Sequence, residues 1–85
     1  MPTVLRKGSF QFRIYPNDHG PPHVHAVKGS GSARILLGEG ECPPLLDRLH
    51  DLTDREAMRA MRIVESARDA LLDAWKGLHG EAETE

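Results

Sequence analysis

One stretch decides the fold of this chain: SFQFRIY, residues Ser9–Tyr15, in which apolar and polar side chains alternate. Alternation with a period of two is typical of a β-strand that buries one face and leaves the other open. We therefore expect the two phenylalanines and Ile14 to face a core. Gln11, Arg13 and Tyr15 are expected on the opposite face.

Further strand-like segments lie on both sides of this stretch. Pro2–Arg6 is β-prone, and the loop 16–22 is dense in turn formers and leads into His23–Lys28. A tight glycine-rich connection follows, after which Ser32–Leu37 alternates again. Because consecutive strands joined by short loops usually pair, the first half of the chain predicts an antiparallel β-meander.

The second half of the chain predicts a helix. A Gly/Pro-rich break at Gly38–Pro44 precedes Leu45–Leu52, where we expect a short helical turn. Thr53–Glu56 has the capping-box pattern, in which the Thr hydroxyl and the Glu carboxylate satisfy each other's backbone N–H groups, so a helix begins at Asp54. Its end is expected between Gly77 and Gly80. The apolar stripe expected to face the sheet comprises Met58, Met61, Val64, Ala67, Leu71, Leu72, Trp75 and Leu78.

These elements define one small α+β domain. We predict a three- to four-stranded antiparallel β-meander followed by one long C-terminal amphipathic helix packed on one sheet face. The domain spans 1–80, and residues 81–85 are expected to form a disordered acidic tail. A domain of this size buries only about 60% of the surface of its unfolded chain, so a partner chain would add to its stability.

Composition narrows the class of protein. The formal net charge is −2, from 11 basic and 13 acidic residues, which argues against binding DNA by bulk electrostatics. The one cysteine, Cys42, cannot form an internal disulfide, and no signal-peptide pattern opens the chain, so we expect a cytoplasmic protein. No apolar run approaches the roughly 20 residues that a membrane-spanning helix needs, and we expect no membrane contact.

The open face of the predicted sheet carries the residues best suited to chemistry. On the third strand the apolar positions are the better core candidates. This places His23 and His25 on the open face, beside Arg13, Tyr15 and Arg34. A one-residue slip in register would reverse the assignment.

The paired histidines are compatible with metal binding. As ligands at i and i+2 on one side of a strand, His23 and His25 form a candidate site for a divalent metal such as zinc. His19 or Asp18 from the preceding loop would complete it. Structural zinc sites usually show four clearly spaced ligands, and this chain lacks the cysteines. Two exposed histidines that bind nothing specific are the simpler interpretation.

Alternatively, His23 and His25 act as acid and base in metal-independent RNA cleavage. One imidazole would remove a proton from a ribose 2′-hydroxyl while the other protonates the leaving oxygen. Arg13 or Arg34 would then stabilise the phosphate charge. Only the geometry of the site decides whether such a pair is catalytic.

Two residues of the predicted helix stand apart from the rest. Arg68 lies at the edge of the apolar stripe, where a guanidinium needs a carboxylate or carbonyl partner, and it is expected to position the acidic loop or a partner. Trp75 lies within the stripe, where a core anchor is the expected role.

Several segments together resemble a known family. They are the opening Met1–Arg6, the aromatic strand into Tyr15, residues 17–25 with the sequence NDHGPPHVH, and the closing Leu71–Trp75. Over most of its length the chain is similar to the small bacterial family called domain of unknown function 4160. The PPHVH core is the specific part of the resemblance.

The resemblance implies a partner rather than a mechanism. Members of this family are often encoded beside a second small protein, and they are commonly suggested to belong to toxin–antitoxin-like modules. The chain departs from the family pattern at 38–44, where a Gly/Pro-rich passage replaces the usual short acidic link. The family's characteristic positions are occupied here by Asp18, His23, His25, Arg68 and Trp75.

These observations lead to one leading hypothesis and two alternatives. The hypothesis is a binding or regulatory module of a toxin–antitoxin-like pair, whose helix or open sheet edge holds the second small protein or a second copy of this chain. Asp18, Tyr15 and Arg68 are the binding candidates, and the histidine face meets a ligand, with RNA as one candidate. The alternatives are a small endoribonuclease-type toxin that uses His23 and His25, and a metal-binding module.

Overall fold

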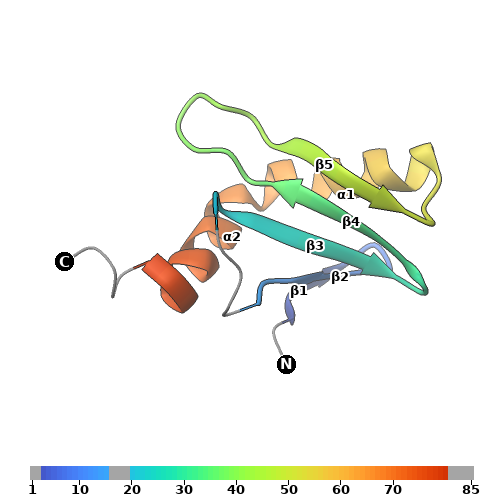
Figure 1. The fold of residues 1–85 in the computed structure, drawn as a ribbon, viewed down its shortest axis with the longest axis horizontal. Helices are drawn as coiled ribbons and strands as arrows, with labels where there is room; N and C mark the ends of the chain where they lie inside the picture. The colour runs from blue at the N-terminus through green and yellow to red at the C-terminus, as the bar shows by residue number, and fades with distance from the viewer. Residues whose placement is uncertain (1–2, 16–19, 81–85) are drawn as a thin grey trace.

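The first half of the chain folds into a single antiparallel sheet. The computed structural model describes residues 3–15 and 20–80, so the predicted tail at 81–85 lies outside the described residues. The strands pair in chain order, which makes the sheet a five-stranded meander (Figure 1). The strands are β1 (Thr3–Lys7), β2 (Phe10–Arg13), β3 (His23–Lys28), β4 (Gly31–Leu36) and β5 (Leu45–His50).

The strand β5 corrects the predicted helical turn at Leu45–Leu52 and raises the strand count above the three to four expected. All six of its residues are exposed, so its sequence carries no alternation of buried and open positions. Its backbone pairs antiparallel with β4 from Ser32↔His50 to Leu36↔Leu45. Pairing with a strand that is already in place, rather than burial of an apolar face, therefore makes this segment a strand.

The expected single long helix is divided into α1 (Asp54–Ser66) and α2 (Arg68–Trp75), and a π-helical turn, η1 (Lys76–Gly80), follows. The division falls at Ala67, whose φ of −108° and ψ of 15° leave helical geometry. The hydroxyl of Ser66 donates to the carbonyl of Ile63 at 3.0 Å, a contact of the kind that bends helices. The bend lets α1 lie behind the sheet while α2 lies beside the end at which β3 begins (Figure 1).

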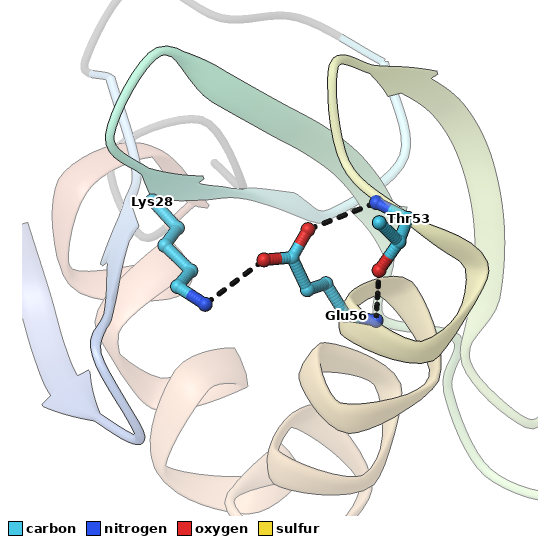
Figure 2. Close-up of polar contacts among 3 residues, drawn as sticks. All are labelled: Lys28, Thr53 and Glu56. Carbon is cyan, nitrogen blue, oxygen red and sulfur yellow. Dashed lines mark hydrogen bonds and ion pairs between the residues drawn. The ribbon is translucent and has the colours of Figure 1, made fainter.

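The predicted capping box at the start of α1 is confirmed. The backbone N–H of Thr53 donates to Glu56 Oε1 at 2.9 Å, and the backbone N–H of Glu56 donates to Thr53 Oγ1 at 3.1 Å (Figure 2). Lys28 at the end of β3 donates to the other carboxylate oxygen of Glu56 at 2.9 Å. The backbone N–H of Thr53 and, after it, Lys28 lower the pKa of Glu56 below its ordinary value, because both donate to the carboxylate and favour its charged form.

The face of the sheet that was predicted to be buried does form the core. The helix stripe needs one correction, since Met58 and Leu78 were expected to be buried but are 58% and 43% exposed. The buried positions of α1 lie on another phase of the helix, which is set by how the helix docks on the sheet. The buried cluster comprises Phe10, Phe12, Ile14, Val24, Ala26, Ala33, Ile35, Leu37, Ala60, Ile63, Val64, Leu71 and Trp75. No helix in the described part of the chain is long and apolar enough to span a membrane.

Candidate functional site

Strand register brings four basic side chains into one row on the sheet face opposite α1. Arg13 of β2 pairs with His25 of β3, His25 pairs with Arg34 of β4, and Arg34 pairs with Arg48 of β5. Directly paired residues in neighbouring antiparallel strands point to the same face, with Cβ atoms about 5 Å apart. We call Arg13, His25, Arg34 and Arg48 the basic row. The predicted position of His25, on the open face beside Arg13 and Arg34, is confirmed.

The arginines of the basic row differ in their partners. The register of β4 and β5 shifts after Arg34, and Asp47 is the additional residue of this bulge. The Asp47 carboxylate accepts from Arg34 Nε at 2.7 Å and from Arg34 Nη2 at 2.6 Å, which neutralises that guanidinium. Arg13 donates to the amide oxygen of Gln11 at 2.8 Å, a neutral partner, and keeps its charge. Arg48 lies on the exposed edge strand.

A chain of four aromatic rings runs from the basic row to the helix α2. The ring centroids of Tyr15 and His25 lie 5.1 Å apart, as do those of His25 and His23, and those of His23 and Trp75. The first two contacts are edge-to-face, a favourable arrangement for aromatic pairs. The cluster links the third strand to a residue that lies about fifty positions further along the chain.

Burial of His23 corrects the expectation of two exposed histidines. Its side chain is only 4% exposed, whereas His25 is half-buried. The reason is Trp75, which belongs to α2 and packs on the imidazole at the end of the sheet. His23 Nδ1 lies 2.9 Å from the carbonyl oxygen of Pro21, and a carbonyl only accepts, so Nδ1 is the donor in this contact.

A groove runs along the β5 end of the basic row, with a volume of about 440 Å³. His50 enters it from β5, and its Nε2 lies 3.5 Å from a carboxylate oxygen of Asp51. Two imidazoles and two guanidinium groups therefore face one cavity, which we call the basic groove. It is lined by His25, Ser32, Ala33, Arg34, Arg48, Leu49 and His50.

Two groove residues, Arg48 and His50, were missed by sequence reasoning. Both lie on β5, and the segment was expected to be a helical turn in which alternation has no meaning. Their i, i+2 spacing is the same as that of His23 and His25, and it is the signal that would have placed them on one face of a strand.

The remaining predicted site residues fall elsewhere. Arg68 begins α2, away from the basic row, and its Nη2 donates to the carbonyl oxygen of Gly40 at 3.0 Å, so it holds the 38–44 link as expected. Asp18 and His19, predicted as ligand-binding and metal-binding residues, lie outside the described residues. Within the described part of the chain, no group of three or more His, Cys, Asp or Glu side chains is placed to hold a metal ion.

Comparison with known proteins returns one family and no individual relative. The sequence model of a family described as Domain of unknown function (DUF4160) matches residues 9–76, which include every strand of the sheet except β1, and both α-helices. No curated protein and no solved structure matches the chain.

Proposed function

The chain belongs to the DUF4160 family, a domain of unknown function, and we propose that it is a binding module that recognises a phosphate-bearing ligand, RNA in the first instance, on its basic row. The observation that carries the proposal is the register itself, which sets Arg13, His25, Arg34 and Arg48 side by side across four strands. Guanidinium groups are the side chains best matched to phosphate oxygens, because they donate several hydrogen bonds in a fixed plane.

The distribution of charge fits a local site better than a wide electrostatic surface. The net charge of −2 gives no general attraction to nucleic acid. The basic side chains must therefore act by direct contact at short range, where they replace the counterions of a phosphate. The half-buried Arg13 and Arg34 of the basic row, rather than the exposed arginines of α1, are placed for such contact.

The proposal includes a second protein, as in toxin–antitoxin-like pairs. Its support is the edge strand β5, which has no neighbour on its outer side among the described residues; Leu46 and Leu49 of this strand are 36% and 41% exposed. Met58 of α1 is exposed nearby, and it lines one cavity with Leu46. Edge strands with apolar side chains commonly accept a further strand from a partner. We infer that the second small protein pairs here, with a second copy of this chain as the competing occupant.

Light scattering after size-exclusion chromatography distinguishes these occupants. The chain alone is expected to be a monomer and to form a larger species with the product of the neighbouring gene. Leu46→Lys, which charges the outer edge, should abolish that species, while Arg6→Glu on β1, at the opposite edge of the sheet, should not. A stable dimer of the isolated chain would assign the edge to self-association instead.

An endoribonuclease is the second candidate function, and one observation favours it. The basic groove holds two imidazoles, His25 and His50, together with two arginines, which is the set of groups that metal-independent RNA cleavage needs. His25 and His50 are better placed for this than the predicted pair, because His23 is buried against Trp75. Cleavage of RNA in EDTA with a bell-shaped pH–rate profile, abolished in His25→Ala, would establish this activity. Binding without cleavage leaves the protein a binding module.

Fluorescence anisotropy with a labelled RNA oligonucleotide tests the binding proposal. Arg48→Gln should weaken binding and make the dependence of log K on log salt less steep by about 0.7, the value for one phosphate contact to a single strand. Arg55→Gln, the same change of charge on the exposed face of α1, is the matched control and should leave the slope unchanged. Equal losses in the two variants would show that only net charge matters, and the proposal would fail.

A further inference from the structure

An apolar pocket lies on the same sheet face as the basic groove and immediately beside it. Its volume is about 390 Å³. Leu36 and Leu45 are paired across β4 and β5, and Leu36 lies two residues beyond Arg34 on the same face. Two residues of strand correspond to about 6.6 Å, so the pocket and the groove are neighbours. The lining consists of Pro21, Pro22, Leu36, Gly38, Glu39, Cys42, Pro43 and Leu45.

The 38–44 link that forms one wall of the pocket is held in place by several contacts. Leu37 N–H donates to the carbonyl oxygen of Pro22 at 2.9 Å, and Cys42 N–H donates to that of Glu39 at 3.0 Å. Gly38 has a φ of +71°, and a Cβ there would lie 2.3 Å from the carbonyl oxygen of Cys42, so the link folds back tightly at a position that only glycine fills. Arg68 holds the outer turn of the same link. The pocket is thus a preformed cavity.

From this juxtaposition we infer that the ligand is single-stranded RNA, with a phosphate in the basic groove and the adjoining base in the apolar pocket. The inference rests on the proposed function and narrows its ligand. In a nucleotide one sugar joins an anionic phosphate to a flat, largely apolar base. On the protein surface a cationic groove, which suits the phosphate, lies beside an apolar pocket, which suits the base. Prolines and leucines supply flat apolar walls for the base.

A base can enter the pocket only if it is not stacked inside a duplex. Proteins that read RNA through its bases take them from single strands and loops, where the bases are unstacked and splayed out. A double helix presents phosphates to the basic groove but no base to the pocket. The pocket therefore predicts a preference for single strands that the basic row alone would not give.

Binding to oligonucleotides with and without bases tests the inference. The natural chain should bind a short single-stranded RNA about 5- to 150-fold more tightly than an abasic strand of the same length, the range for one stacked base. Leu45→Ser should remove most of this difference without changing the salt slope. Leu78→Ser is the matched control, because Leu78 is an exposed leucine that lines neither the pocket nor the basic groove, and the difference should survive.

Cys42 supplies a test that needs no variant. It is the one cysteine of the sequence, it is exposed, and it lines the pocket. Adenosine 5′-monophosphate should slow its alkylation by iodoacetamide, whereas ribose 5-phosphate at equal occupancy of the basic groove should not.

The outcomes separate the inference from the function on which it rests. If abasic and base-bearing strands bind equally, or if both nucleotide and ribose phosphate leave Cys42 equally reactive, the inference is wrong while the phosphate site stands. If neither strand binds, the proposed function and the inference both fall. Tighter binding of duplex than of single-stranded RNA would also overturn the inference.

Discussion

Removing the negative charge of Asp47, which lies beside the basic row, should strengthen ligand binding. Asp47 is the additional residue of the bulge in β5, and its carboxylate lies 2.6 Å from Nη2 and 2.7 Å from Nε of Arg34. The variant Asp47→Asn keeps the size of the side chain and an oxygen acceptor, but it releases the charge of the guanidinium. We therefore expect a gain in affinity for RNA, the opposite of what most site substitutions produce.

The size of the gain follows from the geometry of the pair. A phosphate on the other side of the Arg34 guanidinium would lie about 6 Å from the Asp47 carboxylate, where two like charges repel by about 0.7 kcal/mol in bulk water and more at a protein surface. That corresponds to at least about a threefold tighter complex at low salt. If the released guanidinium takes a phosphate of its own, the salt slope should also steepen by about 0.7. Because both side chains of the ion pair are about one-third exposed, at 36% and 33%, its loss should cost at most about 1 kcal/mol of stability.

Anisotropy titrations with one labelled RNA strand between 50 and 200 mM salt, roughly the range in which phosphate contacts are revealed, measure both quantities. Glu65→Gln is the matched control, because it makes the same change of net charge on α1, on the other side of the sheet. Equal gains in the two variants would show that the effect belongs to net charge. Weaker binding by Asp47→Asn would show that the ion pair with Arg34 shapes the site, and the reasoning would be refuted.

Three predictions concern the stability of the fold and its pH dependence. The pKa of Glu56 is lowered in the folded chain, so its contribution is present at neutral pH and is lost as the pH falls below the ordinary value of 4.5 through the lowered one. Urea melts should therefore show Glu56→Gln to be less stable at pH 7, with the deficit closing in acid; a deficit that stays constant with pH would contradict this. Gly31→Ala places a Cβ 2.3 Å from the Asp51 carbonyl oxygen and should cost about 1–3 kcal/mol, whereas Gly77→Ala meets nothing within 4 Å and should cost nothing measurable in the same melts. Trp75→Ala should cost about 3–5 kcal/mol by calorimetry, since the ring is only 6% exposed in the core; a loss below about 1 kcal/mol would place the ring outside the core.

The residues of the basic row show how far sequence patterns reach into the site. Alternation along Ser9–Tyr15 and Ser32–Leu37 put Arg13 and Arg34 on the open face, and the apolar positions of the strand between them put His25 there too. These assignments needed only the two-residue alternation of side chains along each strand and the pairing of consecutive strands that short loops connect. Arg48 was not placed in this way, because Leu45–Leu52 was expected to be a helical turn, and the exposure of every residue of β5 leaves the strand without alternating burial.

What the sequence determined by itself is what local rules encode: the α+β class, the core face of the sheet, the capping box at Thr53 and the family. The tertiary structure alone decided the strand character of β5, the bend at Ala67 and the burial of His23. The strand character of β5 and the burial of His23 depend on contacts between different segments of the chain, such as Trp75 on His23. The spacing of apolar side chains in one segment indicates which of its faces is buried. It does not indicate which distant segment covers that face.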